Sequence, residues 1–185
     1  TFVGQADHAG TTPMKYRKDA LYAAVKAIQY LHDALDALDP ALVYTTGKIS
    51  AHPNIHTIIP DEVKVTLDAR HYDPAVIQQV LAIIHAMPTE WVGCSMHYEE
   101  AWSRKSVAYD DRLVTMVANS ADALGYTKLQ MHSGPGHDAQ YVADMLPTSM
   151  IFVPSVEGHS HCELEFTPTE ACAKGVNVLI ETLLT

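Results

Sequence analysis

Apolar and polar side chains alternate along this chain with two different periods. A spacing of three to four residues predicts amphipathic helices, and a spacing of two predicts strands with one buried face. In chain order, the first part of the sequence is predicted to contain a strand at residues 2–7, a helix at 16–38, strands at 42–50 and 63–69, a helix between Asp73 and Met87, and a strand at 93–101. The order strand, helix, strand, strand, helix, strand predicts a ferredoxin-like α+β domain over residues 1–104.

The second part of the chain has a different pattern. Its predicted elements are a helix from Asp110 or Asp111 to about Leu124, a short strand at 129–131, a helix that opens after residues 133–138, a buried strand at 148–153 and a final helix at 168–184. Helices that alternate with short apolar strands are typical of α/β domains. These few elements make a thin domain, so residues 105–185 are predicted to be part of an α/β domain within a longer protein.

Composition narrows the class of protein. The chain has 185 residues, of which 48% are hydrophobic and 18% charged, so it can bury a core. Its formal net charge of -10 argues against nucleic acid and anionic membranes as partners, and no apolar run is long enough to cross a bilayer. Cys94, Cys162 and Cys172 are widely spaced and form no CxxC pair, which indicates a reducing, cytoplasmic location.

Two polar residues in the first part are candidates for chemistry. His8 follows the first predicted strand and precedes a loop of glycine and threonine residues, where an imidazole can donate to a substrate oxygen or exchange a proton near neutral pH. A structural role is the alternative for His8. Arg70 ends a strand on its polar face, where its guanidinium can form a fork to a carboxylate. The alternative for Arg70 is a surface ion pair with Asp68.

Two loops in the second part are also candidates. Residues 133–137 precede a predicted helix, whose opening amides attract anions, although Asp138 can instead be a plain helix cap. His161 lies in a loop after a buried strand, where α/β proteins usually place ligands. One histidine does not make a metal site, because zinc takes three or four protein ligands. A non-metallic role for His161 therefore stays open.

Four motifs, in this order along the chain, resemble those of a known family. They are Gly4-Gln5-Ala6-Asp7-His8-Ala9-Gly10-Thr11-Thr12-Pro13-Met14, then Asp68-Ala69-Arg70, then Ser133-Gly134-Pro135-Gly136-His137-Asp138-Ala139, and last Ser160-His161 after Pro154. With these motifs the chain resembles the M20-type metal-dependent amidohydrolases. The most similar branch is hydantoinase/carbamoylase, which comprises N-carbamoyl-L-amino acid hydrolases, beta-ureidopropionases and allantoate amidohydrolases. The motifs span nearly the whole chain.

The resemblance implies a fold, a reaction and cofactors. Family members are homodimers whose ferredoxin-like lid domain makes the dimer contact. The lid is inserted in an α/β catalytic domain that holds two divalent metals, usually zinc, manganese or another transition ion. These metals activate a water that attacks a small carbamoyl or ureido acid and breaks its C–N bond. Residues 1–104 would then be the lid, and residues 105–185 the C-terminal segment of the catalytic domain.

The resemblance also implies roles for single residues. His8 is similar to the lid histidine that reaches the partner subunit's active site and polarises the scissile carbonyl. Arg70 is similar to the arginine that grips the substrate carboxylate, and Gly136 and His137 are similar to a loop that lines the substrate pocket. His161 is similar to the last histidine ligand of the metals.

The chain departs from the family in several places. Thr57 stands where an asparagine is usual, thirteen residues before Arg70, so the clamp on the substrate is altered. Pro135 replaces a usual alanine, and His159 replaces a usual apolar residue. The other metal ligands and the general-base glutamate have no counterpart here, so this chain alone is expected to be inactive. Two alternatives remain: an M20 aminoacylase or peptidase that cleaves amides, and a non-catalytic dimerisation or binding module.

Overall fold

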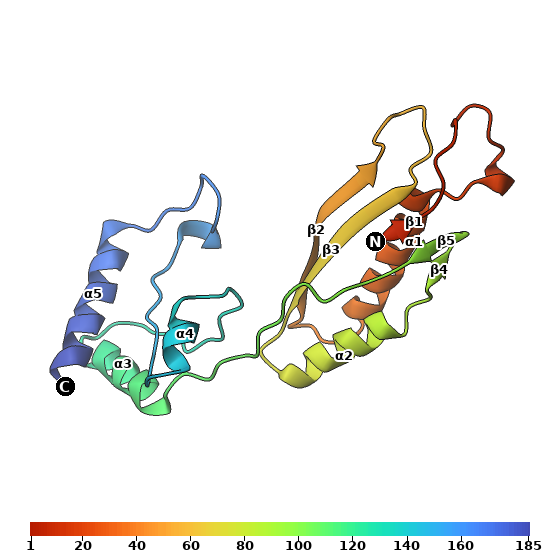
Figure 1. Ribbon diagram of the computed structural model, residues 1–185. Helices are drawn as coiled ribbons and strands as arrows, with labels where there is room; N and C mark the ends of the chain where they lie inside the picture. Colours follow the sequence, from red (N-terminus) through yellow and green to blue (C-terminus); the bar gives the residue numbers. More distant parts are fainter. The chain divides into compact units, whose positions relative to one another are not determined.

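The computed structural model describes residues 1–185 and divides them into two units, Thr1–Ser106 and Val107–Thr185. We call them unit 1 and unit 2. Unit 1 contains every strand of the structure, whereas unit 2 consists of helices, turns and irregular segments (Figure 1).

A five-stranded antiparallel sheet forms the centre of unit 1. Its strands are β1 (Phe2–Val3), β2 (Val43–His52), β3 (Glu62–Arg70), β4 (Glu90–Trp91) and β5 (Cys94–Met96), in the order β2-β3-β1-β5-β4. Phe2 of β1 pairs with Val63 of β3 on one side and with Met96 of β5 on the other, so β1 lies between β3 and β5 in the sheet. The sheet and its helices make unit 1 a mixed α and β structure of the α+β class, as the hydrophobic pattern predicts.

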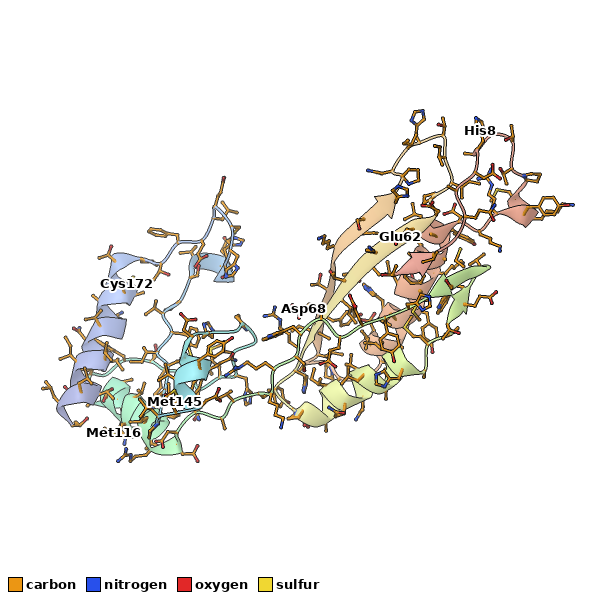
Figure 2. The ribbon with its side chains drawn as sticks, viewed as in Figure 1. His8, Glu62, Asp68, Met116, Met145 and Cys172 are labelled. Carbon is orange, nitrogen blue, oxygen red and sulfur yellow. The ribbon has the colours of Figure 1, made fainter.

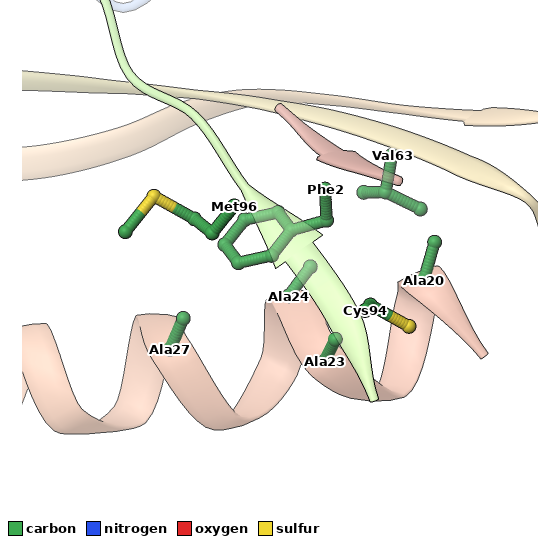
Figure 3. Packing of buried hydrophobic residues seen from close by; sticks show 8 residues of the cluster. All are labelled: Phe2, Ala20, Ala23, Ala24, Ala27, Val63, Cys94 and Met96. Atoms are coloured by element: carbon green, nitrogen blue, oxygen red, sulfur yellow. The ribbon is translucent and has the colours of Figure 1, made fainter. Parts of the chain in front are cut away.

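Two helices cover one face of this sheet. The helices α1 (Ala20–Asp36) and α2 (Pro74–His85) begin after Asp19 and Asp73, whose carboxylates accept hydrogen bonds from the first backbone amides of each helix. Figure 3 shows that α1 turns a row of alanines toward the sheet. These alanines belong to a buried hydrophobic cluster between α1 and the sheet, which consists of Phe2, Ala20, Ala23, Ala24, Ala27, Val63, Cys94 and Met96. Leu67, on the same face of β3 as Val63, packs into a second cluster that includes α2.

Three predicted bounds in unit 1 are corrected. The first strand, predicted to reach Asp7, ends at Val3: the Gly4 amide still donates to the Asp61 carbonyl in the register of the sheet, but the Gln5 amide donates to the Lys18 carbonyl and the chain leaves the sheet. The first helix, predicted from residue 16, begins at Ala20 after the 3-10 turn η1 (Met14–Tyr16). The strand predicted at 93–101 is a hairpin of β4 and β5, whose turn residues Val92 and Gly93 have φ of 52° and 77°.

Unit 2 is held together mainly by two helices. The helices α3 (Asp111–Ala123) and α5 (Thr169–Leu184) pack together, and between them along the chain lie α4 (Ala139–Ala143) and the 3-10 turn η2 (Val156–Gly158). Ser120, Ala121 and Val178 are its buried residues. The Thr182 hydroxyl donates to the Ser120 hydroxyl at 3.0 Å across this contact.

The strands predicted at 129–131 and 148–153 are wrong. Both segments are extended or irregular, and neither pairs with a strand. Val153 instead packs against α5 at Gly175, which has no side chain. A Cβ at residue 175 would lie only 2.6 Å from Cγ1 of Val153. An isolated apolar segment cannot form a strand, because its backbone amides and carbonyls need a neighbouring strand as partner. None of the helices in either unit has the length and apolar character that crossing a bilayer requires.

Candidate active site

The loop between β1 and α1 carries His8 and lies beside the connection between β2 and β3. The Ala9 amide donates to the Thr57 carbonyl at 2.8 Å, and the Ile59 amide donates to the Asp7 carbonyl at 2.9 Å. Figure 2 shows His8 at the end of unit 1 where these two connections lie. The structure therefore brings two predicted site residues, His8 and Thr57, together on neighbouring loops, and both are exposed.

The imidazole of His8 is held by one backbone group. Its Nδ1 atom accepts a hydrogen bond from the Gly10 amide at 3.0 Å. Because a backbone amide can only donate, Nδ1 carries no proton, and the proton of the neutral ring is on Nε2. A Cβ at residue 10 would lie 3.1 Å from Cε1 of His8, so a side chain there would shift the ring by a few tenths of an ångström. The exposed ring can therefore donate from Nε2 to an oxygen atom of a bound molecule.

The backbone of the same loop is closed by local hydrogen bonds. The His8 carbonyl accepts from the amides of Thr11 and Thr12, at 3.3 and 3.1 Å, and from the Thr12 hydroxyl at 2.9 Å. At the base of the loop the Gln5 amide donates to the Lys18 carbonyl at 2.9 Å. The loop is exposed, but its conformation is determined by these bonds over most of its length.

Arg70 forms the ion pair that sequence analysis left open. Its Nε and Nη2 atoms donate to the two carboxylate oxygens of Asp68, at 2.9 and 2.6 Å. The hydrogen bond from Arg70 holds the pKa of Asp68 below its ordinary value, and the bond to Asp68 raises the pKa of Arg70. Both side chains are about half exposed, at 47% and 49%. Asp68 thus orients one edge of the guanidinium on the solvent-facing side of the sheet.

His8 and Arg70 lie at opposite ends of β3. Thr57, beside His8, precedes the start of β3 at Glu62, and Arg70 is the last residue of that strand. Figure 2 shows the same separation between the labelled residues His8 and Asp68. The eight residue steps from Glu62 to Arg70 span about 27 Å. A small acid cannot contact both residues of one chain.

The loop before α4 contains Gly136 and His137. Nε2 of His137 lies 2.9 Å from the Ser133 hydroxyl, and its ring packs edge-on against Phe152 with 5.3 Å between centroids. Gly136 is exposed. Asp138 occupies the N-cap position of α4, but its side chain accepts no hydrogen bond there. The contact with Ser133 therefore holds the His137 ring within its own loop.

His161 has an unusual backbone conformation. Its φ of 56° lies in the left-handed region, which is costly for a residue with a side chain and is retained mostly where a site needs it. Its amide donates to a carboxylate oxygen of Glu165 at 2.8 Å, and the Val156 amide closes the loop on the Phe166 carbonyl at 2.8 Å. No group of three or more His, Cys, Asp or Glu side chains in the chain could hold a metal ion. These residues alone do not fit a metal centre.

Sequence analysis gave no role to two residues that shape the His8 loop. The Gly10 amide donates to the His8 ring, and Arg17 donates to the loop backbone. Gly10 belongs to the motif that was read for its histidine, and Arg17 comes three residues after its end. The signal that could have found them is that a short exposed loop with a candidate histidine needs neighbouring groups to fix its conformation.

Comparison with known proteins decides the family. The sequence family described as peptidase family M20/M25/M40 matches residues 16–185. The chain belongs to this family. Allantoate amidohydrolase of Bacillus subtilis (strain 168) is 36% identical to it, over 99% of this chain and 45% of the relative. N-carbamoyl-L-amino-acid amidohydrolase of Rhizobium meliloti is 33% identical, over 100% of this chain and 45% of the relative.

A solved structure agrees with this result. A crystal structure of an amidase of the hydantoinase/carbamoylase family from Burkholderia vietnamiensis matches with a TM-score of 0.86 and 35% identity. That match covers 99% of this chain and 45% of the other chain. The chain thus spans a little less than half the length of the relatives it matches.

Proposed function

We propose that this chain supplies the lid and the C-terminal catalytic segment of a cytoplasmic, metal-dependent amidohydrolase. Its substrates would be N-carbamoyl amino acids or related ureido acids such as allantoate, and it would hydrolyse their C–N bond. The observation that carries the proposal is the exposed His8 ring. Its Nδ1 accepts from the Gly10 amide, which leaves the proton on Nε2 free to donate to a bound molecule. The names of two relatives support the substrate class.

The proposal assigns the two units separate parts. Residues 1–104 would be a ferredoxin-like lid, which the strand order β2-β3-β1-β5 and the two helices on one face support. Residues 105–185 would complete an α/β catalytic domain, in which the apolar segments without strand partners would join a sheet. Gly136 and His137 would line the substrate pocket in that domain.

His8 would act on the scissile carbonyl. As a water adds to the carbonyl carbon, negative charge grows on the oxygen, and a hydrogen bond from Nε2 of His8 becomes stronger. The C–N bond then breaks, and the leaving nitrogen takes up a proton. Thr57 would offer a hydroxyl to the same substrate, because its backbone is paired with that of Ala9. Arg70 would bind the substrate carboxylate with its guanidinium, which Asp68 orients.

The proposal includes two divalent metal ions, zinc or manganese, as the family resemblance implies. When bound, such ions supply an activated water. His161 would contribute one ligand, and the remaining ligands and the general base would come from residues outside this chain, because its own side chains form no such group. We therefore expect the isolated 185-residue chain to be inactive even with metal added.

Two copies of the chain would be needed for one substrate. His8 and Arg70 lie too far apart on one β3 to share a small acid, so the His8 of one subunit would serve the site that holds the Arg70 of the other. The edge strand β2, which pairs only with β3, offers unpaired backbone groups for such a homodimer.

Subunit mixing tests this arrangement in the complete protein. His8→Ala and Arg70→Met variants should each be nearly inactive. After unfolding and refolding of an equal mixture, half of the dimers carry one of each, and one of the two sites in such a dimer is intact. About a quarter of wild-type activity should therefore return. Activity that does not return after verified subunit exchange would show that both residues serve the same site from one subunit.

The function itself is tested by ammonia release from N-carbamoyl amino acids and from allantoate, with manganese or zinc present. His8→Ala should lower kcat about 10²- to 10³-fold, the usual loss when a donor to a developing oxyanion is removed. His97→Ala, on another exposed residue of unit 1, is the control and should keep wild-type kcat. Cleavage of amides but not of ureido acids would favour an aminoacylase or peptidase, and binding without turnover would favour a non-catalytic module.

A further inference from the structure

A charged side chain is linked to the His8 ring through a single peptide group. Nη2 of Arg17 donates to the Ala9 carbonyl. The same peptide group ends in the Gly10 amide, which donates to Nδ1 of His8 at 3.0 Å. The two hydrogen bonds therefore lie in series, from the guanidinium through the Ala9–Gly10 peptide to the imidazole.

Hydrogen bonds in series strengthen one another. A cation at the carbonyl oxygen draws electron density away from the peptide nitrogen, so the Gly10 amide becomes a stronger donor. A stronger donor at Nδ1 disfavours a proton on that atom and keeps the proton of the neutral ring on Nε2. The charge of Arg17 thus acts on the tautomer of His8 without touching its ring.

Arg17 also fixes the shape of the loop. Its Nε atom donates to the Thr12 carbonyl at 3.0 Å, so one guanidinium bridges carbonyls on both sides of Gly10. The side chain is partly buried, which strengthens such bonds. The turn η1 directs Arg17 back toward the loop, since the Arg17 amide donates to the Met14 carbonyl at 3.2 Å. Lysine offers a point charge without this planar fork and cannot bridge both carbonyls in the same way.

We propose that Arg17 is a positioning residue that holds His8 in its Nε2-protonated form and aims the ring. The proposal rests on the function proposed for His8 above. Arg17 itself would not contact the substrate, and its effect would pass through the Ala9–Gly10 peptide. Its loss should therefore lower kcat far more than it raises KM.

The tautomer can be measured without any substrate. In the 185-residue chain labelled with ¹⁵N-histidine, His8 of the wild type should show a protonated Nε2 and an unprotonated Nδ1 at pH values where the ring is neutral. Arg17→Met should move both ring nitrogens toward averaged shifts, as the two tautomers exchange. Thr12→Val is the matched control, because it removes a different bond of the same loop, from the Thr12 hydroxyl to the His8 carbonyl. It should leave the His8 tautomer unchanged.

Two further variants keep the test valid if Arg17→Met does not fold. Gly10→Ala places a methyl group 3.1 Å from Cε1 of His8 and should displace the ring while Arg17 stays in place. Arg17→Lys should give a pattern between wild type and Arg17→Met. If Gly10→Ala changes the His8 shifts and neither Arg17 variant does, Arg17 has no influence on the tautomer and the proposal is wrong.

Kinetics of the complete protein separate this proposal from the proposed function. Arg17→Met should reduce kcat up to about 10²-fold, the usual cost of a misplaced reacting group, with little change in KM, whereas Thr12→Val should stay near wild type. Wild-type activity in Arg17→Met would overturn the role of Arg17 and leave the amidohydrolase function intact. A complete protein that cleaves no C–N bond, together with the predicted tautomer change, would overturn the function and support the link from Arg17 to His8.

Discussion

Units 1 and 2 bury their apolar side chains to very different extents. Fourteen of the sixteen buried apolar residues belong to unit 1, and only Ala121 and Val178 belong to unit 2. Unit 1 exposes fourteen large apolar side chains, and unit 2, although shorter, exposes sixteen. Those of unit 2 are Leu129, Met131, Tyr141, Val142, Met145, Leu146, Phe152, Val153, Val156, Leu164, Phe166, Val176, Leu179, Ile180, Leu183 and Leu184. A sheet covered by two helices gives each apolar face a partner, whereas two packed helices cover only one side of each other.

The difference extends to the candidate site residues. In unit 1 the His8 loop is tied to the β2–β3 connection and to Lys18 and Arg17 before α1. In unit 2 the loop around His161 is closed by bonds within the loop itself, among them those from Val156 to Phe166 and from His161 to Glu165. Unit 1 therefore holds its candidate residue through contacts with other elements of its fold, while unit 2 holds His161 through bonds local to its loop.

The largest expected effect comes from removing a core side chain of unit 1. Leu35 is fully buried between α1 and α2, and Leu35→Ala should lower the free energy of unfolding by about 2–5 kcal/mol. Leu183 of unit 2 is 76% exposed, so Leu183→Ala should change the free energy of unfolding by less than about 0.5 kcal/mol. Urea unfolding, followed by tryptophan fluorescence and by helical circular dichroism, measures both free energies. The fluorescence reports on unit 1, because Trp91, which packs against its core, and Trp102 both lie there. Equal losses would show that Leu183 is buried in solution.

The same contrast explains how far the sequence predicts the fold. In β3 the alternation of apolar and polar residues is confirmed: Val63, Val65, Leu67 and Ala69 face the helices, and the residues between them are exposed. These strands and helices find their partners within the same stretch of chain. The runs at 129–131 and 148–153 have the same local preference, but no strand in the chain pairs with them. Local pattern predicts a strand, and only a neighbouring strand stabilises it.

The candidate site shows a similar division. The motif around His8 identifies the histidine as a candidate. It does not reveal that the Gly10 amide donates to Nδ1 of the ring or that Arg17 donates to the backbone of the loop. The ion pair of Arg70 follows from its neighbour Asp68, two positions away on the same face of the strand. The separation of His8 from Arg70 depends on which loops pair, and that is a property of the folded sheet.

A smaller effect is expected from the helix caps. Asp19 accepts hydrogen bonds from the amides of Leu21 and Tyr22, and Asp19→Ala should lower the stability of unit 1 by about 1 kcal/mol. Asp138 holds the same position before α4 without a side-chain bond, so Asp138→Ala should leave stability nearly unchanged. Urea midpoints of the two variants provide the comparison. A loss for Asp138→Ala as large as that for Asp19→Ala would mean that Asp138 has a structural partner in solution.

The smallest effects concern two carboxylates, one in each unit. A hydrogen bond with His52, at 2.7 Å, lowers the pKa of Asp61 below its ordinary value. A hydrogen bond from Lys174 likewise lowers the pKa of Glu170 below its ordinary value. A carboxylate whose pKa is lowered by folding stabilises the folded state above its unfolded pKa, and this contribution is lost as the pH falls through the folded pKa. Both bonds should therefore weaken in acid.

The two carboxylates differ in what their bonds connect. The bond of Asp61 joins the end of β2 to the segment before β3, nine positions apart, whereas that of Glu170 joins neighbouring turns of α5. Below about pH 4, where carboxylates titrate, the urea midpoint measured by tryptophan fluorescence should therefore fall less steeply with pH in Asp61→Asn than in the wild type. Glu170→Gln should leave that midpoint unchanged and reduce only the acid dependence of the helical signal. If Glu170→Gln also shifts the unfolding midpoint measured by tryptophan fluorescence, the two units unfold together. They would then differ in how well they are packed but not in their stability.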